Sequence, residues 1–372
     1  MTLPGITPAA IAAALLVGSH RAQPEVGPLP WRFVTERTIA PPDGSKGELG
    51  EIVSLAIADD GTVYAMQKSP ASVLVFGPDG NYLRTIGAEG DGPGELRSGV
   101  IGVKGNLLMV QDWSASRFTI FQTSGAFVKS IPSLCCQQYG TLHIDSAGRA
   151  WVEGPVRGRR SGYLRIDSRG RVIDSIPADT LRSGRSWTAR AASGQGPSEY
   201  RMPLPGEPYE ISALRYDGLI LRGRSDSMRF VLSRNSRDTV KIFEGPTTRL
   251  PVTAAEKREL LEATIQRLPT AALQESLRKV ARASDIPNRT NAWNGLMLDR
   301  ENRTWADLPP TRGGEGRFGV FDRNGKYLGE VPFPKRRPSR LWVMGKDRIA
   351  VLEEGDNGLP EILVYKLVIG VR

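Results

Sequence analysis

The chain has 372 residues, and 50 Lys and Arg against 40 Asp and Glu give it a formal charge of +10. Its 41 Gly and 27 Pro stay below the roughly 25–30% of a low-complexity chain, and 40% apolar residues can build a core, which excludes disorder and collagen. No apolar run reaches the roughly 18–20 residues of a membrane-spanning helix.

The first 23 residues form a candidate leader. Residues 9–18 are apolar over the length of a signal-peptide core, and the small residues Ser19 and Ala22 follow. No Lys or Arg precedes this run, so three interpretations stay open: a weak signal peptide, a misplaced start or a helix. We expect an exported protein, periplasmic or secreted, whose mature chain begins near Gln23.

The cysteines and histidines narrow the chemistry. Cys135 and Cys136 are adjacent, so they are either small apolar residues at the start of a strand or a strained vicinal disulfide in a binding site. Outside the leader, His143 is the sole histidine, which excludes a zinc site built from two or three histidines. It lies in an apparent strand, where we expect a packed side chain rather than a catalytic one.

A unit of two hairpins recurs along the chain. Its turns carry two series of glycines with spacings of 43 to 45 residues: Gly61, Gly105 and Gly148, and Gly80, Gly125 and Gly170. Glycine accepts the positive φ of a tight hairpin turn, and four short strands repeated every 40–50 residues are typical of β-propeller blades. The spacing therefore predicts an all-β propeller.

Three looser units follow, over residues 209–245, 295–328 and 340–368, after a polar connection. The last unit supplies three strands, and residues 31–39 can pair with it as the outer strand and so join the two ends of the ring. The count predicts a six-bladed β-propeller over residues 31–370.

A helical stretch interrupts the repeats at residues 253–283, between blades four and five. Thr253 and Glu256 form a capping box. Apolar residues at helical spacing follow on both sides of Pro269: Leu261, Ile265, Leu268, Leu273, Leu277 and Val280. The insertion is either a lid over one mouth of the ring or a substrate gate or partner-docking surface.

The segment Gly-Asp-Gly-Pro-Gly-Glu-Leu at residues 90–96, followed by an inner strand and by residues 117–121, resembles the NHL repeat of bacterial six-bladed propellers. The segments at 194–200 and 46–51 echo it. The resemblance implies fold more than function, because such propellers include protein-binding and RNA-binding modules and amidating lyases. The lyases use zinc-binding histidines that this sequence lacks. Similar lactonases hold calcium at the inner strands, but no matching motif occurs in this sequence.

Ligand sites of a propeller lie where its inner strands begin, because all blades converge there. The candidate channel-mouth residues are Glu51, Arg97, Gln137, Gln138, Glu210, Asn294 and Arg340. Their mixed charges suit a polar or acidic ligand, and Glu51, Glu210 and Asn294 offer oxygen ligands for a hard cation such as calcium. The alternative is that they are ordinary solvated loop residues.

Arginines cluster at 157–171, and Lys335, Arg336 and Arg337 form a second basic group. The sequence pI of about 9.7 fits a polyanion partner. Strand alternation would scatter the first cluster over two faces, however, so the charge favours an anionic envelope surface over nucleic acid.

No nucleophile elbow, phosphate loop or paired-carboxylate motif occurs, and no catalytic residue is identified. The leading hypothesis is a monomeric, non-catalytic binding or interaction module for a protein, peptide or envelope ligand. The alternative is a calcium-dependent lactonase or hydrolase-type propeller enzyme, and the third hypothesis is an RNA-binding propeller.

Overall fold

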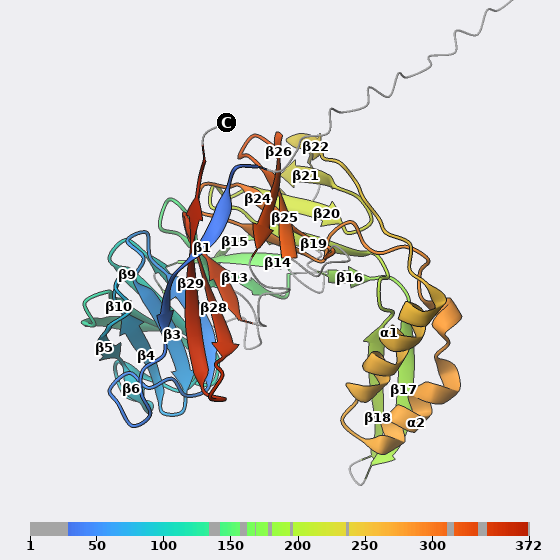
Figure 1. Ribbon diagram of the computed structural model, residues 1–372. Helices are drawn as coiled ribbons and strands as arrows, with labels where there is room; N and C mark the ends of the chain where they lie inside the picture. Colours follow the sequence, from blue (N-terminus) through green and yellow to red (C-terminus); the bar gives the residue numbers. More distant parts are fainter. Residues whose placement is uncertain are drawn as a thin grey trace, which may run out of the picture.

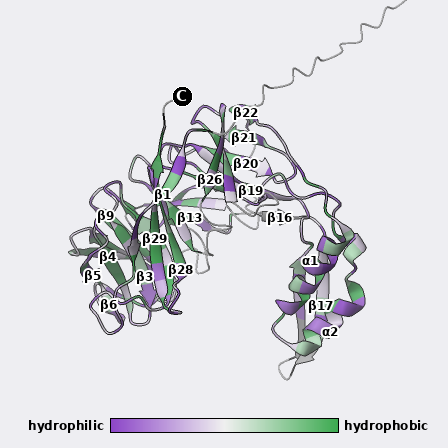
Figure 2. Ribbon diagram, viewed as in Figure 1, coloured by the Kyte–Doolittle hydropathy of each residue, from purple (hydrophilic) through white to green (hydrophobic). Residues whose placement is uncertain are grey.

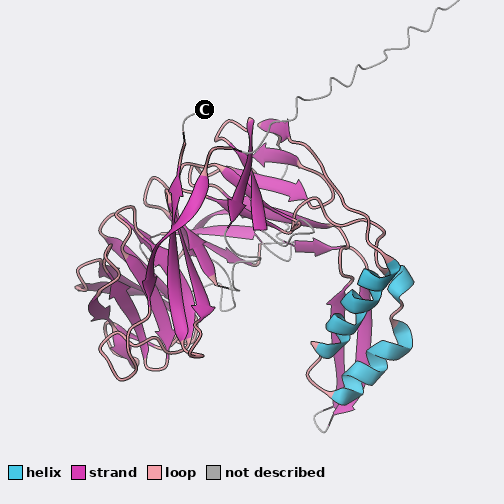
Figure 3. Ribbon diagram, in the orientation of Figure 1, coloured by secondary structure: helices cyan, strands magenta, loops and turns pink. Residues whose placement is uncertain are grey.

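The computed structural model describes residues 29–133, 142–156, 162–167, 169–177, 181–193, 196–235, 238–310, 316–333 and 341–370. These residues form six antiparallel sheets arranged as the blades of a propeller (Figures 1 and 3). The prediction of an all-β, six-bladed propeller is confirmed.

Blades one to three each contain four strands, which follow one another from the inner to the outer edge of the sheet. Blade one contains β2 (Ile52–Ile57), β3 (Val63–Lys68), β4 (Ala71–Phe76) and β5 (Tyr82–Ile86). Blade two contains β8 (Gly99–Lys104), β9 (Leu107–Asp112), β10 (Arg117–Gln122) and β11 (Phe127–Pro132). Blade three contains β12 (Leu142–Ile144), β13 (Ala150–Gly154), β14 (Gly162–Ile166) and β15 (Val172–Pro177).

Blades four to six complete the ring. Blade four contains β19 (Tyr209–Leu214), β20 (Ile220–Arg224), β21 (Arg229–Ser233) and β22 (Lys241–Glu244), and β16 (Leu181–Ser183) adds a strand inside β19. Blade five contains β23 (Gly295–Leu298), β24 (Thr304–Leu308), β25 (Gly316–Phe321) and β26 (Tyr327–Phe333). Blade six contains β27 (Trp342–Met344), β28 (Arg348–Glu354), β29 (Pro360–Val368) and β1 (Arg32–Ile39).

The first and the last strand of the described residues pair in blade six. Strand β1 pairs antiparallel with β29, from Arg32 opposite Val368 to Ile39 opposite Ile362. The glycines of both predicted turn series have positive φ, from 55° at Gly105 to 104° at Gly125. These backbone conformations explain why the repeat is visible in the sequence, since other residues rarely adopt them.

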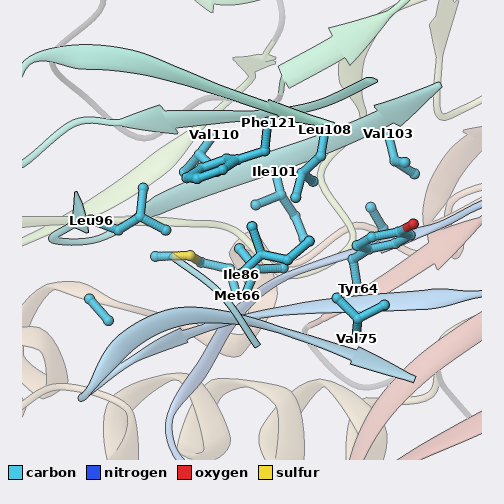
Figure 4. Close-up of a cluster of buried hydrophobic side chains, with 13 residues drawn as sticks. Tyr64, Met66, Val75, Ile86, Leu96, Ile101, Val103, Leu108, Val110 and Phe121 are labelled. Atoms are coloured by element: carbon cyan, nitrogen blue, oxygen red, sulfur yellow. The ribbon is translucent and has the colours of Figure 1, made fainter. Parts of the chain in front are cut away.

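Apolar side chains fill the spaces between neighbouring blades. Each of the six interfaces within the described residues has its own buried cluster. Between blades one and two, Met66 and Val75 meet Val110 and Phe121 (Figure 4). Apolar residues accordingly concentrate on the blade strands (Figure 2). Burial on both faces of each sheet is what holds the ring together.

A seventh cluster belongs to a separate unit that projects from the ring near blade four (Figure 1). It consists of the hairpin β17 (Ser186–Ser193) and β18 (Gly196–Pro203), and of α1 (Ala254–Gln266), α2 (Ala271–Val280) and the 3-10 turn η1 (Ala283–Asp285). The hairpin precedes β19 in the chain, whereas the helices follow β22 and precede β23. We call these segments the inserted unit.

The inserted unit differs from the sequence expectation in two places. The polar connection before blade four contains the hairpin β17–β18, with Trp187 and Ala189 buried against the helices. Val280 is 52% exposed because it is the last residue of α2 and lies outside the packed face, whereas Leu273 and Leu277 are buried. The predicted capping box at Thr253 is confirmed. None of the helices within the described residues is long and apolar enough to cross a membrane.

Candidate functional site

A central cavity of about 250 Å³ lies between the inner strands. Residues of β2, β8, β12 and β27 line it, and Tyr216 and Arg300 reach it from the turns of blades four and five. The innermost strand of each blade has a free edge, so its N–H and C=O groups face the channel and need partners there. Ser54 supplies one: its hydroxyl accepts from the backbone N–H of Ile101 at 3.2 Å.

Arg300 closes the cavity at the end where β2 and β8 finish. Its Nη2 donates to the carbonyl oxygens of Ile57 at 2.6 Å and Val103 at 3.1 Å, and its Nη1 donates to Oδ1 of Asp59 at 2.6 Å. Burial raises the pKa of Asp59, but the charge and hydrogen bonds of Arg300 outweigh it and hold the pKa below its ordinary value. One guanidinium therefore joins blades one, two and five.

His143 lies in the same cavity, on β12, and its ring packs against Tyr216 with centroids 4.3 Å apart. Burial lowers the pKa of His143 to about 4, against the opposing charge of Asp145. Burial also raises the pKa of Tyr216. Both rings are therefore neutral near pH 7, as expected of the packed histidine that the sequence indicated.

The predicted channel-mouth residues occupy different surroundings. Gln137, Gln138, Arg340, Cys135 and Cys136 lie outside the described residues. Glu51 is exposed and accepts from Nζ of Lys68 at 3.0 Å.

Arg97 and Asn294 have local partners as well. Arg97 pairs with Asp91, and its backbone N–H donates to Asp112 at 2.8 Å. The carbonyl of Asn294 accepts from the hydroxyl of Tyr209 at 2.5 Å. This hydrogen bond links the segment before blade five to the first residue of β19, next to Glu210. Their roles toward a ligand stay predictions.

Glu210 lines a second pocket, of about 400 Å³, which we call the blade-four pocket. Its polar lining residues come from β19, β20, β21 and the turn between β20 and β21: Glu210, Ser212, Arg222, Arg224, Asp226, Ser227 and Arg229. Glu210 lies at the start of β19, which β16 separates from the channel, and its role toward a ligand stays a prediction.

This pocket occupies the face of blade four that is turned toward blade three. Side chains alternate along a strand, so Glu210 and Ser212 share a face with Leu214, and Arg222 and Arg224 share it with Ile220. Leu214 and Ile220 pack against Trp151, Tyr163 and Ile176 of blade three. The hydroxyl of Tyr163 donates to the carbonyl of Ser212 at 2.9 Å. The apolar interface therefore gives way to charged residues along the same two strands.

One repeated turn motif was not identified from the sequence. Asp-x-x-x-Arg-x-Trp occurs at residues 145–151 and 299–305, at the first turn of blades three and five. In both turns one carboxylate accepts two backbone N–H groups, the arginine Nε and the indole N–H. Because these bonds satisfy the carboxylates internally, the motif is structural.

Within the described residues, no group of three or more His, Cys, Asp or Glu side chains is arranged to hold a metal ion. Calcium binding therefore stays an untested prediction.

No protein-family model matches the sequence, and no curated protein matches it. A solved member of the DUF4221 family from Bacteroides vulgatus is similar in structure, with a TM-score of 0.50 and 11% identity over 91% of this chain and 99% of that one. A putative exported protein from Bacteroides fragilis has a TM-score of 0.48 at 11% identity, covering 92% and 95%. Virginiamycin B lyase from Staphylococcus aureus has a TM-score of 0.42 at 12% identity, covering 91% and 99%.

At these identities the likeness shows a shared propeller fold alone. The NHL assignment is not among the similarities found, and the neighbours include proteins without a known activity as well as enzymes.

Proposed function

We propose that the protein is a monomeric, non-catalytic binding module of NHL-like type, which takes a protein, peptide or envelope ligand on the side of the ring where the inner strands begin. One observation carries the proposal: the blade-four pocket places charged side chains where a blade interface would otherwise bury apolar ones. Polar groups that converge in a cleft of several hundred Å³ are typical of ligand sites.

The surroundings of the pocket support this proposal. The hairpin β17–β18 enters the chain before β19, and the helices leave it after β22, so both parts of the inserted unit branch from connections to inner strands. We propose that the helices are an insertion between blades four and five, and that together with the hairpin before β19 they offer the ligand a second surface. Export directed by the leader at residues 1–23 would place the module in the periplasm or outside the cell.

The competing hypothesis is a lactonase or hydrolase, and turnover separates the two. Purified protein is incubated with a panel of lactones and esters, with and without calcium. The proposal predicts no turnover above that of a buffer blank. Turnover that Glu210→Ala or Asn294→Ala abolishes would establish the enzyme instead.

A further inference from the structure

Two arginines of the blade-four pocket have hydrogen-bond donors to spare. Nε of Arg224 donates to Asp226 at 2.9 Å, and Nε of Arg229 donates to Glu244 at 2.9 Å. Within the described residues, the terminal Nη1 and Nη2 groups of both side chains have no acceptor, and both side chains are about half exposed. Two guanidinium forks therefore remain available to a carboxylate, which they can bind with two parallel hydrogen bonds.

A carboxylate lies in the same row. Glu210 is the direct cross-strand partner of Arg224. The register of β20 and β21, with Gly223 opposite Phe230, puts Arg229 across from Arg224 on the other side. Glu210, Arg224 and Arg229 thus form one row over three strands, spaced by about 4.8 Å.

Arg224 bonds Asp226 in preference to its neighbour Glu210. On its other side Glu210 lies opposite Arg182 of β16. Among the residues whose side chains the structure describes, the carboxylate of Glu210 makes no hydrogen bond or ion pair, although opposite charges in direct cross-strand positions usually attract each other. Its carboxylate is therefore left for a cation, next to guanidinium groups left for an anion.

We propose that the blade-four pocket binds a ligand that carries both an ammonium and a carboxylate group. The ammonium pairs with Glu210, and the carboxylate pairs with Arg224 or Arg229. A free amino acid spans the first two positions of the row, and a short peptide with free ends reaches the third. This assignment rests on the proposed binding function and names its ligand class.

Other charge types fit the pocket less well. A bare anion such as phosphate meets the like charges of Glu210 and Asp226, whereas a bare metal cation meets three arginines. Each of these ligands leaves one set of charges uncompensated, which costs affinity because desolvated charges need partners.

The test is isothermal titration with alanine and alanyl-alanine as zwitterionic probes. N-acetylalanine lacks the ammonium, and alanine methylamide lacks the carboxylate. Charged hydrogen bonds of this kind correspond to about tenfold or more in affinity. We expect both blocked analogues to bind at least tenfold more weakly than alanine, and the ratio of alanine to alanyl-alanine affinity to tell a free amino acid from a peptide.

Two variants assign the groups. Glu210→Gln should bind alanine and N-acetylalanine equally, and Arg224→Gln should bind alanine and alanine methylamide equally. Glu354→Gln and Arg32→Gln, at exposed positions of blade six, are the matched controls and should keep the wild-type preference.

Acetate that binds as tightly as alanine would overturn the zwitterion assignment, and so would failure of every zwitterionic probe to bind. If no zwitterionic probe binds but crystallographic soaking finds other small molecules in the pocket, the proposed binding function is still supported. An empty pocket after the same soaks would contradict both.

Discussion

The interface between blades one and two and the interface between blades three and four are built on the same repeat but filled differently. Within the described residues the first buries thirteen apolar side chains, including Phe121 and Met66 (Figure 4). Of the described residues, the second buries five apolar side chains, and charged residues of the blade-four pocket continue the same face. A closed ring tolerates one weak interface because the other five hold the neighbouring blades. At the interface between blades three and four, charged residues of a candidate site therefore replace part of the apolar core.

The largest expected effect comes from the well-filled interface. Phe121→Ala removes a buried ring and leaves a cavity, so we expect the free energy of unfolding to fall by about 3–5 kcal/mol. Urea unfolding followed by circular dichroism measures it. A loss below about 1 kcal/mol would mean that this interface is no better packed than the weak one.

The next effect concerns the weak interface, where His143 of blade three packs on Tyr216 of blade four. Because burial lowers the pKa of His143 to about 4, the unfolded chain binds a proton below pH 6.5 that the folded chain refuses. The contribution of neutral His143 to the free energy of unfolding is fully present above pH 6.5. It decreases by about 2–3 kcal/mol as the pH drops toward 4. In His143→Gln this component should be absent, so equal pH slopes for the two proteins would refute a buried neutral histidine.

Arg300 tests the strong interface from the channel side. Arg300→Lys keeps a positive charge near Asp59, but an ammonium group cannot bridge the carbonyls of Ile57 and Val103 in the same way. We expect a loss of about 1–2 kcal/mol in unfolding free energy. The same exchange at the exposed Arg258 is the control and should change stability by less than about 0.5 kcal/mol.

The smallest effect is expected from replacing a charged residue of the blade-four pocket with an apolar one. Arg222→Leu extends the apolar patch of Leu214 and Ile220 over the floor of the blade-four pocket. We expect unchanged stability or a gain of up to about 1 kcal/mol, together with loss of ligand binding, because natural sites trade stability for function. Thermal melts and titration with alanine measure the two outcomes. A large loss of stability would show that Arg222 holds the interface together.

The ring could be predicted because its signals are local. Turn glycines with positive φ recur at a fixed period, and each blade's strands are neighbours in the sequence. The inserted unit could not be assembled in this way, since Trp187 packs against helices about ninety residues later and its indole N–H donates to Asp285. The alternation of Trp187, Ala189 and Ala191 is the signal that would have identified the hairpin.

The candidate site shows the same limit. Its position at the start of an inner strand led to Glu210, but the arginines beside Glu210 come from strands β20 and β21, whose alternation does not reveal which blade they face. Arg300 was missed because its partners Ile57 and Asp59 are more than 240 residues away in the chain. Channel contacts of this kind depend on ring closure.

We place the ligand site at the weak interface between blades three and four. A crystallographic screen in which crystals are soaked with small amino acids, carboxylates and amines tests it most directly. We predict that bound molecules gather in the blade-four pocket, with carboxylates at Arg224 or Arg229 and ammonium groups at Glu210. Molecules found elsewhere on the surface, with this pocket empty, would contradict the claim.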